Sequence, residues 1–451
     1  MKKKKIQKNI DGKELIHIND IMGEDTTKPI TLQMIDTHID KFIASKISSK
    51  SFGVIKSYAV NTNQGITRDY NEDRVSIVIN MNKPNYYNSS IPWTKISFFG
   101  VFDGHAGSKC ADFLRDNLLE YIINNQYFPS DIPNAIKTGF KNIDEYYLKT
   151  FSFIDGKLID NSGSCGLILL IMNNIIYIAN VGDSRCIGSF QNGKLQKDIT
   201  IDHKPNSPEE KNRIIKNGGS IYQTQTPLED ELFKDKILVG PYRVTPGKLS
   251  VSRTVGDAEG KIEEIGGNKK VIISSPDIYQ FNLDKDDIDF FILGCDGIYD
   301  QLTSKEVLDC AWNIINNNIE MLKNKKSNNV FKGNFGSEIN LNTTSGNITD
   351  LILKASMIRK SFDNVTCLFV SFKDFLFNIN KENNNNDNNN DNNNENNNIN
   401  INNKKLGLKE LLFKNNLCSN IKNNENIDKN ENEKENEITI SFQQKKKIKK
   451  N

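Results

Sequence analysis

The sequence predicts an α+β domain in which antiparallel strands and helices form packed layers. Two apolar segments, residues 167–172 and 175–181, are separated only by Asn173 and Asn174. This pair suits a tight hairpin, because asparagine tolerates the positive φ angles that such turns need. Strands joined by two residues must run antiparallel, which argues against a doubly wound parallel sheet. Amphipathic helical segments cluster between the strands, as in layered α+β domains.

The remaining elements follow from apolar periodicity and turn signals. Further strands are expected over residues 184–190, 289–295 and 365–372, and helices over 108–125, 206–219 and 347–360. The helix over 206–219 has the clearest boundaries. Ser207 can cap it, Pro208 takes the first helical position, Glu210 completes a capping box and Gly218 ends it.

Composition divides the chain into three parts. Residues 1–50 form a basic N-terminal extension, and residues 51–373 form the domain, with an asparagine-rich insertion over about 315–348. Residues 374–451 are rich in asparagine and lysine and have too few apolar side chains to offset their ordering entropy, so we expect disorder there. Within this tail, residues 406–417 could form a short amphipathic helix. The final KKKIKKN is read as a solvated tail, with a nuclear import signal or a polyanion contact as alternatives.

Bulk properties restrict the class of protein. A net charge of +2 points to no particular partner, and the seven scattered cysteines form no CxxC pair, so neither a disulfide framework nor a zinc site is expected. No signal peptide, myristoylation site or bilayer-spanning segment is present in the sequence. We therefore expect a soluble protein of a reducing compartment, in the cytoplasm, with the nucleus as an alternative.

Acidic residues recur at the ends of the expected strands. The stretch FFGVFDGHAG, residues 98–107, ends a strand on an aspartate. The acids at strand ends are Glu72, Asp73, Asp103, Asp183, Asp296 and Asp363. Any one of them could simply cap a turn. Several carboxylates gathered at one rim would repel each other, and a divalent cation relieves that repulsion. An all-oxygen ligand set favours Mg²⁺ or Mn²⁺, and the chain has no EF-hand, P-loop or G-x-S-x-G motif.

Ordered motifs across residues 58–372 give the chain a resemblance to a known family. In chain order these are TRDYNEDR, FFGVFDGHAG, SGSCG, ANVGDSR, TIDHKP, GPYRVTPGKLSVSRTVGD, GCDGIYD and DNVT. Together they resemble the metal-dependent Ser/Thr protein phosphatases of the PP2C (PPM) type. The resemblance implies a central antiparallel β-sandwich flanked by pairs of α-helices, with metals in a cleft at one end. Cys165 and Gly166 stand where the family usually has Thr-Ala, which we expect to be a core change without effect on catalysis.

The resemblance also implies a ligand set for two Mg²⁺ or Mn²⁺ ions, with room for a third. The expected metal ligands are Glu72, Asp73, Asp103, Gly104, Asp183, Asp296 and Asp363. Asp103 would bridge the two ions, the Gly104 carbonyl would bind one, and Asp296 with Asp363 would bind the other. Glu72 would help to hold the first ion through waters. Asp183, with the region around Asp296, would bind the third and weaker ion.

Roles in catalysis follow from the same resemblance. Two ions about 3.5–4 Å apart can share one water and lower its pKa from ~15.7 towards ~7, which supplies the nucleophile. Arg68 is the expected phosphate clamp, because a guanidinium fork matches two phosphate oxygens. His105 is the candidate general acid, with a purely structural hydrogen-bonding role as the alternative. His203 and Asp257 are read as structural, although a site role for Asp257 stays open.

The reading as a phosphatase makes phosphorylated proteins the expected partners, without an obligatory regulatory subunit and with a monomeric enzyme. The segment between Gly218 and Gly247 and the insertion at about 315–348 are candidate substrate-facing regions. Two other classes compete. A phosphoprotein-binding scaffold would be expected to lack one or more metal acids, yet they are present. A nucleic-acid module would have to use lysine-rich ends that lack interleaved aromatics.

Overall fold

The fold is that of a computed structural model. It describes residues 14–16, 27–84, 87, 93–227, 236–324 and 339–376. The expected helix over 406–417, the asparagine-rich tail and the terminal lysines lie outside the described residues.

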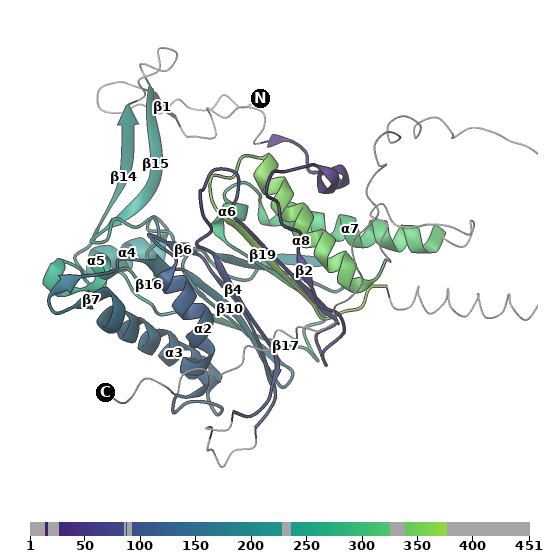
Figure 1. The fold of residues 1–451 in the computed structure, drawn as a ribbon, viewed down its shortest axis with the longest axis horizontal. Helices are drawn as coiled ribbons and strands as arrows, with labels where there is room; N and C mark the ends of the chain where they lie inside the picture. Colours follow the sequence, from purple (N-terminus) through teal and green to yellow (C-terminus); the bar gives the residue numbers. More distant parts are fainter. Residues whose placement is uncertain are drawn as a thin grey trace, which may run out of the picture. The chain divides into compact units, whose positions relative to one another are not determined.

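Two antiparallel sheets face each other across the centre of the domain (Figure 1). The first contains, in order across the sheet, β17 (Asp277–Asn282), β11 (Ile175–Val181), β10 (Gly166–Met172), β5 (Ile96–Phe102) and β4 (Arg74–Met81). The second contains β13 (Leu195–Asp198), β12 (Arg185–Phe190), β18 (Ile288–Gly294), β19 (Val365–Ser371), β3 (Ser57–Asn63) and β2 (Lys46–Ile47). The predicted hairpin is confirmed, because β10 and β11 pair antiparallel and Asn173 has a φ of 56°.

Helix pairs cover the outer face of each sheet. Alternate side chains of β5 explain the layering: Phe99 points into the cluster between the sheets, whereas Phe98 packs in the cluster beneath α2 (Lys109–Ile123) and α3 (Ile132–Tyr147). On the other side, α7 (Ser304–Asn324) and α8 (Leu341–Ile358) pack on the second sheet. The α-β-β-α architecture expected for the sequence is therefore confirmed.

The expectation of an insertion loop over about 315–348 is wrong for most of its length. Helix α7 continues to Asn324 and α8 begins at Leu341, so within this stretch only residues 325–338 lie outside the described residues. The high asparagine content predicted a loop, but the asparagines up to Asn324 lie in a helix. Ile315 is buried against the second sheet, and buried Asn318 donates a hydrogen bond of 2.9 Å to the Thr344 hydroxyl.

Residues 27–50, assigned from sequence to an extension, are part of the folded domain. Side chains of this segment, Ile30, Leu32, Met34, Ile35, Ile39 and Phe42, pack on the cluster beneath α7 and α8. The Lys354 ammonium of α8 donates to the backbone carbonyls of Ile35 and Thr37. At the other boundary Leu376 is buried, so the domain continues past 373. The apolar residues of the segment 27–50 are too irregularly spaced to predict a helix or a strand. They are nevertheless part of the domain, because they pack on its core.

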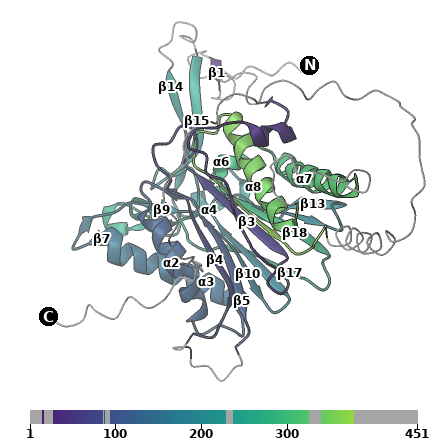
Figure 2. The ribbon, with the colours of Figure 1, turned by 45° about the vertical axis from the view of Figure 1, so that its right-hand side comes forward.

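A small sheet projects from the sandwich where the substrate-facing flap was expected (Figure 2). It consists of β14 (Ser220–Pro227), β15 (Lys236–Thr245) and β1 (Glu14–Ile16), which pairs parallel with β15. A second small sheet, β16 (Val255–Gly256), β9 (Gly163–Ser164) and β6 (Gly104–His105), lies beside the ends of the sandwich strands. Among the residues described, no helix has the length and apolar character needed to cross a bilayer.

Candidate active site

The strand ends that carry acids converge on one pocket of about 220 Å³. Asp103 follows β5, Asp183 follows β11, and Asp296 opens the short helix α6 (Asp296–Tyr299) directly after β18. Asp363 precedes β19. Of the sequence-predicted site residues, the pocket is lined by Arg68, Glu72, Asp103, Gly104, His105, Asp183, Asp296 and Asp363. Residues far apart in the chain are thus brought to one end of the sandwich.

Asp103 and Asp296 have the electrostatics of carboxylates that need a cation. Burial, followed by repulsion from Asp296, raises the pKa of Asp103 well above its usual range. Burial, followed by repulsion from Asp183, does the same to the pKa of Asp296. Within the described part of the chain neither side chain accepts a hydrogen bond. A hard divalent ion fits this donor set, because it would relieve both the repulsion and the missing hydrogen bonds.

Asp73 lies behind the pocket and does not line it. Its buried carboxylate accepts a hydrogen bond of 2.6 Å from the Thr366 hydroxyl, and burial raises its pKa to about 6. Candidate ligand atoms of Asp73, Asp103 and Cys295 still lie within 4.8 Å of one another. Asp73 is therefore close enough to share an ion with Asp103, and its negative charge adds to the repulsion that raises the pKa of Asp103.

Asp183 differs from Asp103, because the chain itself supplies both of its partners. Lys204 Nζ contacts Asp183 Oδ2, and the Cys165 thiol lies 3.3 Å from Asp183 Oδ1. Burial alone would raise the pKa of Asp183, but the Lys204 ammonium outweighs burial and lowers it. Cys165 is buried, as expected for a core position, but it also lines the pocket, and the expectation that it has no effect on catalysis stays a prediction.

Arg68 lies at the pocket rim, half-exposed, with its Nη2 2.6 Å from Asp363 Oδ2 and its Nε 3.2 Å from the Phe362 carbonyl. The expected phosphate clamp is therefore paired with one of the expected metal ligands. Gly104 leaves no room for a side chain. A Cβ there would lie 2.6 Å from the Glu72 carbonyl oxygen, which explains the glycine after the strand.

His105 is held by a buried acid from a distant part of the chain. Its Nε2 lies 2.8 Å from Asp257 Oδ1, and the Asp257 side chain is almost fully buried. Burial lowers the pKa of His105, but the Asp257 carboxylate reverses this and the net pKa is raised. The structure thus favours the site role for Asp257 that the sequence left open.

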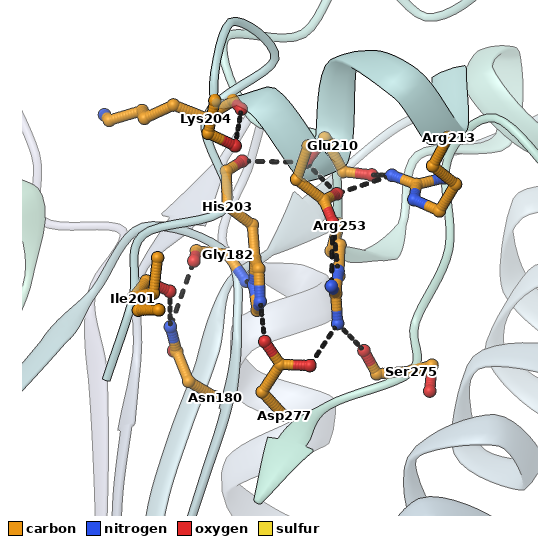
Figure 3. Close-up of polar contacts among 12 residues, drawn as sticks. Asn180, Gly182, Ile201, His203, Lys204, Glu210, Arg213, Arg253, Ser275 and Asp277 are labelled. Carbon is orange, nitrogen blue, oxygen red and sulfur yellow. Dashed lines mark hydrogen bonds and ion pairs between the residues drawn. The ribbon is translucent and has the colours of Figure 1, made fainter. Parts of the chain in front are cut away.

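A polar network surrounds Gly182, the residue that precedes Asp183 in the chain (Figure 3). His203 Nδ1 accepts the Gly182 N–H at 3.0 Å, and His203 Nε2 lies 3.1 Å from Asp277 Oδ2. Arg253 then links Asp277 to Glu210. This arrangement agrees with a structural role for His203.

The same network overturns the predicted capping box of α4 (Pro208–Lys216). The Ser207 hydroxyl donates to the Lys204 carbonyl and makes no side-chain cap. Glu210 is not free to reach back to the helix start, because its carboxylate is engaged by Arg213 and Arg253.

Several pocket residues were not singled out from the sequence. Arg243, from β15, brings a second guanidinium to the lining, and Leu249, Ser250 and Val251 complete the same wall. These residues lie within the motif GPYRVTPGKLSVSRTVGD, so the segment was visible in the sequence. Which of its side chains face the acids depends on how the β14–β15 hairpin docks.

The fold and the pocket define a class: an α-β-β-α sandwich with a candidate hard-cation site at one end. A family model described as Protein phosphatase 2C matches residues 58–340, and the chain belongs to this family. Human Protein phosphatase 1B is 34% identical over 227 residues, which cover 47% of this chain and 42% of the relative. Protein phosphatase 2C 1 of Paramecium tetraurelia is 33% identical over 222 residues, covering 47% and 67%.

The chain spans about half the length of several curated relatives it matches; for human Protein phosphatase 1A the matched share is 52% of the relative. Among solved structures, a C. elegans sex determining protein superposes with a TM-score of 0.50 at 18% identity, covering 74% of this chain and 67% of that one. This likeness supports the fold alone. A serine-threonine phosphatase 2C from Toxoplasma gondii gives a TM-score of 0.49 at 18% identity, covering 73% and 99%.

Proposed function

We propose that this chain is a protein phosphatase that hydrolyses phosphoserine and phosphothreonine in proteins, with two Mg²⁺ or Mn²⁺ ions. The observation that carries the proposal is the convergence of Asp103, Asp296 and Asp363 on one pocket together with Arg68. Family membership supports the reaction class.

The residues that would hold the ions are the acids that line the pocket, together with the Gly104 carbonyl. Asp103 would be shared between the two ions, the Gly104 carbonyl and Glu72 would serve the first, and Asp296 with Asp363 the second. When bound, the ions would supply an activated water as nucleophile and would neutralise charge on the phosphate. A third, weaker ion would use Asp183 with Asp296.

Arg68 would bind the phosphate of the substrate. Its guanidinium is half-exposed and lines the pocket, so it can exchange its contact with Asp363 for two phosphate oxygens. This exchange would keep the cation paired throughout. It would also place the phosphate beside the ligands of the second ion.

His105 would protonate the departing serine or threonine oxygen. Because Nε2 is engaged by Asp257, the proton to be donated would sit on Nδ1. The Asp257 carboxylate fixes the ring and favours the protonated form, which a general acid needs.

The proposed partners are phosphorylated proteins. The enzyme is proposed to act as a monomer, without an obligatory regulatory subunit, in the cytoplasm or the nucleus. The β14–β15 hairpin, which brings Arg243 to the pocket, is the proposed substrate-facing flap.

The test is phosphate release by the purified full chain from a phosphoserine peptide, with Mn²⁺ and after chelation. We expect turnover that depends on Mn²⁺ and is lost in Asp103→Asn. A wild-type chain that binds the phosphopeptide without releasing phosphate at any Mn²⁺ concentration would favour the scaffold instead.

A further inference from the structure

Asp183 is a buried pocket acid whose two oxygens are both engaged by side chains of the protein. Oδ2 pairs with the Lys204 ammonium and Oδ1 accepts from the Cys165 thiol. The Asp183 side chain is only 3% exposed, so water cannot screen the ion pair from that side. A cation arriving at Asp183 therefore meets a carboxylate that already has a positive partner.

The backbone of Lys204 is fixed by surrounding hydrogen bonds. Its carbonyl accepts from the Ser207 hydroxyl at 2.9 Å. The carbonyl of its neighbour His203 accepts from the backbone N–H and the hydroxyl of Ser252, each at 2.9 Å. Figure 3 shows the Lys204 side chain leaving this braced region rather than joining the network.

In contrast to the backbone, the Lys204 side chain is held, among the contacts described, only by its ion pair with Asp183. It is 34% exposed, and four methylenes allow the ammonium to swing into solvent without rearrangement of the chain. The ammonium also acts on the charges of Asp296 and Asp300. Lys204 thus neutralises one side of the pocket, whereas Asp103 has no cationic side-chain partner among the residues described.

We propose that Lys204 is an internal cation that competes with a divalent ion for Asp183, so that the third ion binds only when the ammonium swings away. This inference rests on the metal site of the proposed function. It assigns the weakness of the third site to one residue.

The experiment is a Mn²⁺ titration of the metal-free full chain, with unbound Mn²⁺ read from its electron paramagnetic resonance signal. In Lys204→Met, which keeps the side-chain volume without the charge, the weakest binding event should tighten about ten-fold, within the range usual for coupled sites. Lys204→Arg, which keeps the charge, should titrate like wild type. Lys305→Met removes one charge from an exposed pair on α7 and should also leave the titration unchanged.

Asp183→Asn completes a double-mutant cycle. It should weaken or abolish the weakest event, and adding Lys204→Met to it should then have no further effect. Unchanged or weaker Mn²⁺ binding in Lys204→Met would overturn the proposal, as would equal tightening in Lys305→Met. If two ions bind and phosphate is released but no variant alters a weaker event, only this inference fails. If wild type binds no Mn²⁺, the proposed function fails with it. Thermal unfolding of each variant establishes that it is folded.

Discussion

His105 and Asp257 are 152 residues apart in the chain, yet His105 Nε2 lies 2.8 Å from Asp257 Oδ1. The contact joins β6 to the turn after β16. Asp257 lies in this turn as the N-cap residue of the short helix α5 (Ala258–Lys261), and its φ of 58° is left-handed. The turn is braced from behind, because the Gly256 N–H donates to Asp144 at 2.8 Å. A strained, well-supported turn thus aims a buried carboxylate at the candidate general acid.

Asp257→Asn should shift the pH dependence of phosphopeptide hydrolysis to lower pH. Asp257 raises the pKa of His105, and a general acid works in its protonated form. Activity is therefore lost as pH rises through that raised pKa, and without the carboxylate the loss begins earlier. At pH 8 we expect about a ten-fold lower kcat than wild type. An unchanged pH profile would contradict the positioning role.

His105→Ala should affect substrates according to their leaving group. A serine alkoxide needs a proton to depart, whereas a nitrophenolate does not, so phosphoserine hydrolysis should fall about 100-fold and p-nitrophenyl phosphate hydrolysis far less. Initial rates on both substrates measure the difference. Equal losses on the two substrates would exclude His105 as the proton donor.

Asp296→Asn should weaken metal binding and turnover together. It removes one ligand charge from the pocket, so the Kd for Mn²⁺ should rise at least about ten-fold, since ligand charge sets affinity for hard ions. Calorimetric titration measures this Kd. Asp284→Asn, at an exposed turn, provides the matched control. Wild-type affinity in Asp296→Asn would remove this residue from the ligand set.

Asp144→Ala should be strongly destabilising. Lys261 is 2% exposed and its ammonium contacts both Asp144 oxygens at 2.8 Å, so removal of the acid leaves a buried, unpaired charge. Breaking such a pair costs about 3–5 kcal/mol in free energy of unfolding. Glu145→Ala, from the exposed Lys141 pair on the same helix, should cost at most about 0.5 kcal/mol. Urea unfolding that finds similar costs for both would contradict the account.

Deletion of residues 1–50 should destabilise the domain, although this segment was read from sequence as an extension. Six apolar side chains of the segment pack on the cluster beneath α7 and α8, and their exposure should cost at least about 3 kcal/mol. Deletion of residues 377–451 keeps the buried Leu376 and should leave thermal unfolding and phosphopeptide turnover near wild type. Equal melting temperatures for the two deletions would refute the packing role.

Local sequence patterns predicted the elements and the acids, because strands, hairpins and strand-end residues are encoded by neighbours in the chain. The Asn173-Asn174 hairpin and the α-β-β-α layers are examples. The sequence did not determine which of several possible partners a polar side chain would bind. Glu210 could have capped its helix but pairs with Arg253, and the asparagines around 318 continue a helix.

Partner choice also decides the chemistry of the pocket. The sequence placed Arg68 and Asp183 in motifs, but not the contacts of Arg68 with Asp363 or of Lys204 with Asp183. It also gave no sign that Cys165 would line the pocket. Such long-range pairings depend on how sheets and loops dock, which no local pattern contains.

The central claim is that distant acids gather to hold small dications, and anomalous diffraction from crystals soaked in Mn²⁺ tests it most directly. We predict two strong manganese peaks in the pocket, both touching Asp103, with Asp296 and Asp363 on one of them. Difference maps without a peak among these carboxylates, at a Mn²⁺ concentration that supports full turnover, would contradict the account.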